Sequence, residues 1–374
     1  MKKNLLFILI IGTLAQSCHE KKTTRECVLD NISHIEDSIY YRIDSLPMLC
    51  DELGMNGQLI DIGDCKLYCE VEGEGIPLVV INGGPGGTHH DFHPWFGEAK
   101  DYCKIVYYDQ RGCGQSDFAK GDGYTFRQAV DDLDKLRQRL GIDKWVICGY
   151  SYGGALAQFY STQYPENVLG MVLIGAAPLF QDPAFDGTRQ NDYISEEEKV
   201  RIDELYSKWL SDELSLIQWL YNIDINGDWK RQNFYKPTKE EFIRAALYGW
   251  VNDKGFNNAV SSDYSRYDLK GVFDSNPIPT LICEGKWDLT WTAEKAEVFR
   301  RNHPNAQFVM FENAGHNIFS EDPGLFFPTL KKFVASLKPI TEIDIQKWKQ
   351  HVFEISVNDN FIFLQTSDKQ VCLH

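Results

Sequence analysis

The feature that most constrains the fold of this chain is a glycine-flanked serine at residues 149–153, GYSYG. A short apolar run, residues 144–149, leads into it, and small residues follow at 154–157. Gly-x-Ser-x-Gly between a buried strand and a helix is typical of a strained turn in which the two backbones pass too close for a side chain. Because such a turn exposes the serine hydroxyl, the motif predicts Ser151 as a nucleophile.

Short apolar runs of the same kind recur on both sides of this motif, and helix-like segments separate them. The clearest helical pattern covers residues 126–140, with Gly141 as the stop. Residues 59–62 and 66–71 flank Gly63-Asp64 and predict a hairpin. The alternation predicts an α/β fold, with a mostly parallel sheet and helices on both faces. The predicted buried strands are residues 77–82, 104–109, 144–149, 168–175, 279–284 and 307–312, and a closing helix is predicted at 322–337.

The alternation is interrupted at Pro178. Residues 178–269 are rich in Trp, Tyr, Asp and Glu, with helix-like stretches at 196–210 and 239–250. We therefore expect a helical lid, inserted after the sixth predicted strand, between the two parts of the core, residues 58–177 and 270–338. The C-terminal extension, residues 339–374, alternates at 353–357 and 361–364, which predicts a terminal hairpin.

Charge and composition exclude some classes of protein. The 374 residues carry 38 basic and 54 acidic side chains, a net charge of −16, which would repel a nucleic-acid backbone. No pair of cysteines has the repeated short spacing of a zinc site, and the histidines are not clustered around them. We expect no nucleic-acid partner, no metal and no cofactor.

The first residues predict export. Lys2 and Lys3 precede an apolar run at 5–14, which is too short to span a membrane. The segment 1–18 ends in Ser17-Cys18 and resembles a bacterial lipoprotein signal, in which Cys18 would be lipidated; an ordinary cleaved signal is the alternative. Residues 19–57 would then form a tether and N-terminal extension. We expect an exported protein on the periplasmic side or cell surface, held at the membrane by its lipid anchor only.

Six of the ten cysteines fall into two groups. Those at 27, 50, 65 and 69 lie close enough in sequence for disulfides in an exported protein. Cys148 and Cys283 lie within apolar runs, where we expect them as small buried hydrophobic residues.

A serine nucleophile requires a base, and the base requires an acid to orient it. Asp288 directly follows the predicted strand 279–284, and His316 follows the strand 307–312. The order Ser, Asp, His on loops after successive strands predicts a catalytic triad of Ser151, Asp288 and His316. Asp268 and Asp274 are weaker candidates for the acid because they precede the strand.

The triad needs backbone donors for the oxyanion, and residues 82–87, NGGPGG, follow the strand 77–82. A run of glycines lets backbone N–H groups turn toward a developing negative charge. We expect the oxyanion hole to comprise the N–H groups of Tyr152 and Gly84, with Gly83 as the alternative to Gly84.

Together, NGGPGG, YDQRGCGQS at 108–116, GYSYGG, GKWD and AGH resemble the proline iminopeptidase family of α/β-hydrolases over residues 58–337. The resemblance implies hydrolysis of the bond after an N-terminal residue, often proline, in small peptides. It also implies that Asp109, Gln110 and Arg111 support the glycine-rich loop without taking part in the chemistry.

Three departures from the family pattern concern specificity. Asn82 replaces the usual His, Tyr152 the usual Trp, and the lid pair of Trp and Glu that binds the substrate amine is not matched by Trp250 and Asp253. The amine-binding residue is therefore unknown from the sequence. An exported aminopeptidase is the first hypothesis; a carboxylesterase or amidase acting on another small acyl substrate, and a non-enzymatic surface binding protein, are the alternatives.

Overall fold

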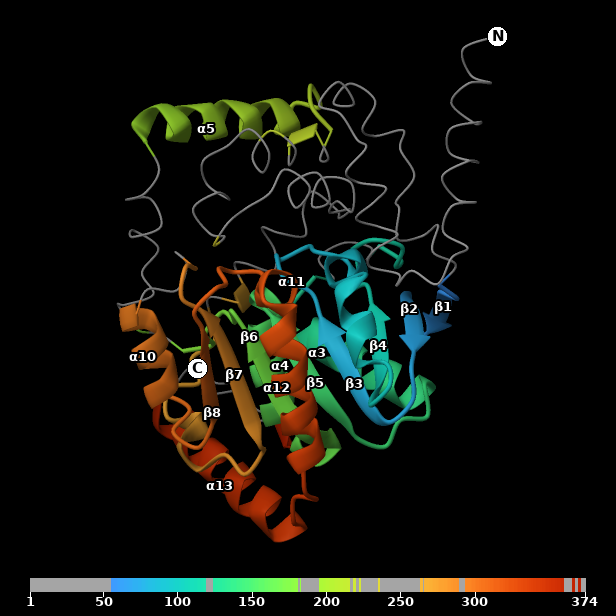
Figure 1. Cartoon of the computed structure of the whole chain (residues 1–374). Coiled ribbons are helices and arrows are strands. Elements are labelled where there is room, and N and C mark those ends of the chain that lie inside the picture. The colour runs from blue at the N-terminus through green and yellow to red at the C-terminus, as the bar shows by residue number, and fades with distance from the viewer. Residues whose placement is uncertain are drawn as a thin grey trace.

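The described part of the chain is built around one eight-stranded sheet, seen in Figure 1, a view of the computed structural model. Several predicted features lie outside the described residues: the signal with Cys18, residues 19–54 of the tether, and the helix at 239–250. The structure describes residues 55–118, 124–180, 182, 195–215, 218–219, 222, 235, 263–264, 266–288, 293–359, 365–366 and 369–370.

The strand order in the sheet is β1-β2-β4-β3-β5-β6-β7-β8. The first pair forms the predicted antiparallel hairpin and β2 is antiparallel to β4, whereas all later neighbours are parallel. The α/β-hydrolase architecture predicted from the sequence is confirmed. The strands are β1 (Gln58–Asp61), β2 (Lys66–Glu72), β3 (Ile76–Ile81), β4 (Cys103–Tyr108), β5 (Trp145–Tyr150), β6 (Val168–Ile174), β7 (Thr280–Gly285) and β8 (Gln307–Phe311).

The chain order reverses at β3, which pairs with β4 on one side and with β5 on the other. In open α/β sheets, the carboxyl ends of the strands beside such a reversal form the crevice in which ligands bind. The topology therefore places any site at the strand ends after β3 and β5, the upper edge of the sheet in Figure 1.

Helices cover both faces of the sheet, and each face has its own buried apolar cluster. Side chains of α3, α4, α10 and α13 belong to one cluster, and those of η3, η4, α11 and α12 to the other. The central strands are apolar along their whole length because both of their faces are covered. The helices are η3 (His89–Phe92), η4 (Trp95–Ala99), α3 (Phe126–Arg139), α4 (Tyr152–Gln163), η5 (Pro165–Asn167), η8 (Val272–Ser275), α10 (Ala293–Arg301), α11 (Ile318–Glu321), α12 (Pro323–Ser336) and α13 (Glu342–Asp359).

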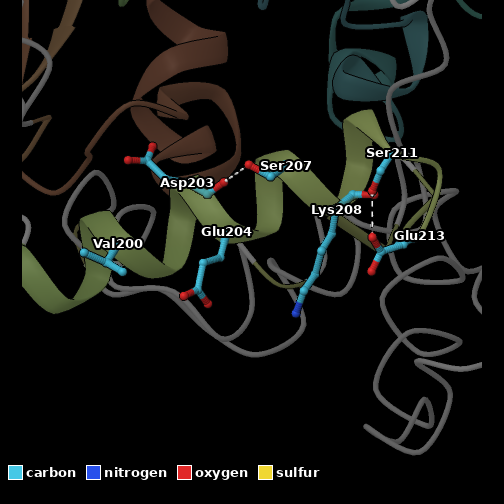
Figure 2. A pocket seen from close by; sticks show the side chains of 7 residues that line it. All are labelled: Val200, Asp203, Glu204, Ser207, Lys208, Ser211 and Glu213. Carbon is cyan, nitrogen blue, oxygen red and sulfur yellow. Dashed lines mark hydrogen bonds between the residues drawn. The ribbon is translucent and has the colours of Figure 1, made fainter.

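Within the predicted lid, the structure describes one long helix, α5 (Glu196–Leu210), with the predicted bounds. Ser195 caps it by accepting a bond from the Glu198 N–H at 3.1 Å. Figure 1 shows α5 beyond the edge at which the parallel strands end. Figure 2 shows the polar side chains lining a pocket along it, where Ser207 bonds the Asp203 carbonyl and Ser211 bonds Glu213. None of its lining residues belongs to the motifs of the sequence, so we assign it no chemistry.

The C-terminal extension differs from the prediction at residues 353–357, which belong to the helix α13 and not to a strand. Ile345, Trp348 and Val352 recur at helical spacing and are buried, and the Trp348 indole donates to the Val272 carbonyl at 2.9 Å. Burial of this apolar stripe favours a helix more strongly than the five-residue alternation favours a strand. A two-strand pairing of β9 (Gln365–Thr366) and β10 (Lys369–Gln370) follows, and residues 361–364 lie outside the described residues.

The cysteines of the described ranges are all free and buried: Cys65, Cys69, Cys103, Cys113, Cys148 and Cys283. Burial of Cys148 and Cys283 was predicted, whereas Cys65 and Cys69 form no disulfide because both side chains pack into the core. In the same ranges, no helix is long and apolar enough to span a membrane.

One core histidine makes stability depend on pH. His303 stacks on Phe273 and Phe299, with ring centroids 4.5 and 4.7 Å away. Burial lowers the pKa of His303 from 6.5 to about 4. Between these values the unfolded chain binds a proton that the folded chain does not, so stability is full above pH 6.5 and falls as the pH drops toward 4.

We expect the wild type to lose about 2–3 kcal/mol of unfolding free energy through this residue between pH 7.5 and 4.5. His303→Phe should remove that part of the loss, as measured by urea unfolding at both pH values. As a control, Phe180→Leu changes a neutral neighbour of His303 and should destabilise equally at each pH. An unchanged pH dependence in His303→Phe would contradict the assignment.

Candidate active site

Ser151 lies in a strained turn between β5 and α4. Its backbone has φ 53° and ψ −121°, a region that non-glycine residues rarely adopt. Three hydrogen bonds hold it there: its N–H donates to the Ile174 carbonyl at 2.9 Å, and its carbonyl accepts from Gly154 at 2.9 Å and Ala177 at 2.8 Å. The turn is thus fixed to the end of β6 and to the first turn of α4.

The glycines around Ser151 are required by contacts between backbones. A Cβ on Gly153 would lie 2.1 Å from the Ile81 carbonyl oxygen, and one on Gly149 would lie 2.3 Å from the Gly153 oxygen. The crossing of β5 and α4, with the end of β3 beside it, leaves no room for larger residues. This is the close passage on which the sequence interpretation of the motif relied.

The glycine-rich loop after β3 lies against the predicted nucleophile. A Cβ on Gly83 would be 3.2 Å from the Ser151 Cβ, and Gly84 adopts φ 122°. The buried Asn82 amide closes the loop by donating to the carbonyls of Gly87 at 3.1 Å and Tyr108 at 3.3 Å. Asn82 therefore fixes the loop through hydrogen bonds of its own, although it departs from the family pattern.

The second expected oxyanion donor is Tyr152, which is the first residue of α4. The first N–H groups of a helix have no partner within it, and they lie at its positive end. The Tyr152 N–H is therefore available for an oxyanion formed at Ser151. Its side chain is buried against Phe126, with the ring centroids 5.8 Å apart.

The structure brings Asp288 and His316 together. Asp288 follows β7 and His316 follows β8, and the Asp288 Oδ2 lies 2.6 Å from the His316 Nδ1. The Asp288 side chain is fully buried, whereas that of His316 is 18% exposed. Asp274 precedes β7, at the opposite end of that strand from Asp288, and Asp268 bonds the Lys270 N–H.

His316 also lies beside the residues at the end of β6 that hold the Ser151 turn. A Cβ on Gly175 would be 3.1 Å from the His316 Nδ1, and Gly175 is the neighbour of Ile174, whose carbonyl accepts from the Ser151 N–H. The imidazole ring is 5.1 Å from that of Tyr150. His316, Asp288 and Ser151 thus gather at the carboxyl ends of β5, β6, β7 and β8.

The buried carboxylate of Asp109 holds the segment that follows the glycine-rich loop. Its Oδ1 accepts from the N–H and the Nδ1 of His89, both at 2.8 Å, and its Oδ2 accepts from the Gln115 N–H at 2.9 Å. Burial alone would raise the pKa of Asp109, but its interactions with His89 outweigh burial and hold the pKa below its usual value. Gly114 is needed because a Cβ there would lie 2.0 Å from the Asp109 Oδ2.

Arg111 and Gln110 differ from Asp109 in what they contact. Arg111 points to α3, where it binds both oxygens of Asp132 at 2.7 and 2.8 Å, and it also binds Asp64 at 2.9 Å. Gln110 is buried, and its amide has no hydrogen-bond partner among the described residues. Arg111 therefore ties this loop to α3 and to the β1–β2 hairpin, away from Ser151.

A second buried carboxyl group, Glu284, lies near Asp288 at the end of β7. Neither of its oxygens has a hydrogen-bond partner within the described ranges. Burial, and then the charge of Asp288, raise the pKa of Glu284 well above its usual value. Burial therefore disfavours the charged form of Glu284, and it is Asp288 that contacts His316.

Sequence reasoning missed two groups at this edge. Glu321 accepts hydrogen bonds from the N–H groups of Gly315 at 2.9 Å and Asn317 at 3.2 Å, on either side of His316. The Glu70 carboxylate lies 2.8 Å from the Nε2 of His93 and 3.5 Å from the Nε2 of His89, the histidine whose other ring nitrogen contacts Asp109. Neither residue belongs to a motif. Glu321 bonds to backbone groups and Glu70 contacts residues of a separate segment, so neither contact produces a recognisable spacing of residues in the sequence.

This fold is matched in known proteins. The alpha/beta hydrolase fold family covers residues 76–323, and the chain belongs to it. The amine-binding pair considered in the sequence, Trp250 and Asp253, lies outside the described residues.

Within the family, the chain is a proline iminopeptidase-like alpha/beta hydrolase, as its motifs predicted. It is 27% identical to a proline iminopeptidase of Saccharolobus solfataricus over 285 residues, 72% of this chain and 87% of the relative. It is 28% identical to that of Lactobacillus delbrueckii subsp. bulgaricus over 299 residues, 74% and 97% of the two chains.

A solved proline iminopeptidase from Mycobacterium smegmatis aligns with a TM-score of 0.53 at 19% identity, over 75% of this chain and 98% of that one. An esterase from Exiguobacterium antarcticum aligns with a TM-score of 0.58 at 22% identity, over 74% and 98%. At these identities the solved structures establish the fold alone.

The backbone crossing at Ser151 predicts a large difference between two glycine substitutions. Gly153→Ala should destabilise the protein by about 2–4 kcal/mol, because the new methyl meets a carbonyl oxygen of β3 that cannot move freely. Gly324→Ala, in the first turn of α12, meets nothing within 4 Å and should be neutral or stabilising by up to about 1 kcal/mol. Urea unfolding measures both, and equal effects would contradict the crossing.

Proposed function

We propose that the chain is a serine hydrolase whose triad is Ser151, His316 and Asp288. The observation that carries this is the 2.6 Å contact between His316 and Asp288, at the strand ends that also fix the Ser151 turn. His316 removes the proton of the Ser151 hydroxyl as the oxygen attacks a carbonyl. Asp288, bonded to Nδ1, sets the ring's tautomer and stabilises its positive charge.

The tetrahedral oxyanion is stabilised by the N–H groups of Tyr152 and Gly84, with Gly83 beside Ser151 as the alternative donor. His316 then gives its proton to the leaving group, and the acyl group remains on Ser151. Water, deprotonated by the same histidine, attacks the acyl-enzyme and releases the acid. Each step is a proton transfer or acyl transfer that these side chains supply themselves.

For the substrate, we propose small peptides with a free N-terminal amine, proline first. The support is similarity to proline iminopeptidases over 70% or more of the chain. An ammonium group beside the carbonyl favours an acidic partner at the site, because a blocked competitor would leave that carboxylate unpaired. The net charge of −16 suits a cationic substrate.

Purified protein lacking residues 1–18 should cleave a prolyl-arylamide, and less rapidly an alanyl-arylamide, while an N-blocked prolyl-arylamide is left intact. Ser151→Ala should reduce kcat by about four to six orders of magnitude, because the nucleophile is absent while the fold is kept. Initial rates of arylamine release measure the effect, and Ser161→Ala, a serine within α4, is the matched control.

Two results would change the assignment. Turnover of short acyl esters without any cleavage of the free prolyl substrate would replace the aminopeptidase with an esterase. If neither the wild type nor Ser151→Ala reacts with any substrate or with a fluorophosphonate probe, a surface binding protein becomes the better interpretation.

We also propose that the chain is exported and anchored by lipid at Cys18. The support is the basic start, the short apolar run and the Ser17-Cys18 junction of the sequence. Acyl chains on one cysteine would hold the chain at the membrane without a spanning helix.

In a bacterial host, the full chain should incorporate radiolabelled palmitate and sediment with membranes. Cys18→Ser should lose the label and leave the membrane fraction, whereas Cys27→Ser should keep both. A wild type that stays unlabelled and sediments with no membranes would contradict the anchor.

A further inference from the structure

We propose that Glu321 is a positioning residue for the base His316 and that it couples the His316 loop to Tyr235 in the segment inserted between β6 and β7. This inference rests on the triad proposed above. Among the described residues, Glu321 accepts hydrogen bonds from the backbone N–H groups of Gly315, Asn317 and Tyr235, and it acts through the backbone on both sides of the histidine.

The first part of the argument is the bonding of one carboxylate oxygen. The Glu321 Oε2 accepts from the N–H of Gly315 at 2.9 Å and from that of Asn317 at 3.2 Å. These two N–H groups belong to the residues on either side of His316, so the same oxygen atom holds the backbone of both neighbours of the histidine. Asp288 fixes the ring through Nδ1, and Glu321 fixes the backbone from which the ring projects.

The second part concerns the other carboxylate oxygen. The Glu321 Oε1 accepts from the backbone N–H of Tyr235 at 2.7 Å. The Tyr235 ring packs on Trp287, with ring centroids 5.4 Å apart, and Trp287 immediately precedes Asp288. The Trp287 indole in turn donates to the Glu312 carbonyl at 2.9 Å, at the start of the His316 loop. Tyr235 thus contacts the loop that carries Asp288 directly, and it contacts the loop that carries His316 through Glu321.

The chemistry of the group explains why it is a carboxylate. Three N–H donors converge on it, and an ionised carboxylate is acceptor-only, with room for more than two bonds on its two oxygens. Charge strengthens each of these bonds. A glutamine offers a single acceptor oxygen, and its NH₂ group would face at least one backbone N–H, so the isosteric change breaks the arrangement without altering side-chain volume.

Loss of this support should slow the chemical step more than it weakens substrate binding. Displacement of a catalytic group by about 1 Å costs about two orders of magnitude in rate. We expect Glu321→Gln to lower kcat by about 100-fold with KM changed less than about threefold, because the ground-state contacts of the substrate remain. Glu321→Asp keeps the charge but is one methylene shorter, and should lower kcat by an intermediate factor.

The test measures the rate at which a fluorophosphonate labels Ser151 in the purified protein without residues 1–18, corrected for the folded fraction from near-ultraviolet circular dichroism. Glu321→Gln should label about 100-fold more slowly than wild type. The matched control is Glu297→Gln on α10, an exposed glutamate that pairs only with its helix neighbour Arg300 among the described residues, and it should label at the wild-type rate. If Glu321→Gln fails to fold, Glu321→Asp takes its place.

The link to Tyr235 is tested by a pair of substitutions. Tyr235→Ala removes the ring but keeps the N–H that binds Glu321, whereas Tyr235→Pro removes both. We expect Tyr235→Pro to label Ser151 more slowly than Tyr235→Ala by about three- to tenfold, because Glu321 then loses one of its donors.

The outcomes separate this inference from the proposed triad. A wild type that fluorophosphonate does not label at Ser151 would refute the triad and this inference with it. A labelled wild type matched by Glu321→Gln and Glu321→Asp would refute the positioning role alone. Equal rates for Tyr235→Pro and Tyr235→Ala would refute the coupling to the inserted segment.

Discussion

The architecture depends on a contact between backbones: α4 starts so close to the end of β3 that the Gly153 Cα lies against the Ile81 carbonyl. This crossing forces Ser151 into a positive φ and sets its distance from the loop that follows β3. Strain of about 1–3 kcal/mol in such a turn persists only when its surroundings fix it. Here the hydrogen bonds of the Ser151 backbone to Ile174, Gly154 and Ala177 do so, and the Asn82 amide holds the glycine-rich loop beside the turn.

Carboxyl groups at the strand ends share one chemistry and differ in their environments. Asp109 accepts three hydrogen bonds that hold its pKa below the usual value, whereas Glu284 has no hydrogen-bond partner within the described residues and burial raises its pKa. Asp288 bonds an imidazole, and Glu321 bonds backbone amides on each side of it. The role we propose for each carboxyl group follows from its partners. The surroundings determine whether the group favours the charged form and which part of the structure it holds in place.

The sequence predicted the features that depend on local pattern. The strands β3 to β8, the helix α3 and the bounds of α5 follow from apolar periodicity, and the placement of Asp288 and His316 follows from motifs after strands. It could not predict α13 at residues 353–357, where burial of Trp348 against η8 decided between helix and strand. Glu321 was missed for a related reason: its partners are backbone amides, which every residue but proline has, so the contact is set by folding and leaves no motif.

The glycines at these crossings also limit how the chain can change over generations. The space of a Cβ at Gly114 is taken by the Asp109 carboxylate, and that at Gly153 by a carbonyl of β3. A Cβ at Gly114 meets a residue of the same motif, and one at Gly153 meets the end of β3 just before the glycine-rich loop, so neither glycine can be replaced unless a neighbouring segment moves. Substitutions at this edge of the sheet are therefore tolerated best at side chains that project outward, whereas the Ser151 turn, the end of β3 and the Asp109 segment change only with their neighbours.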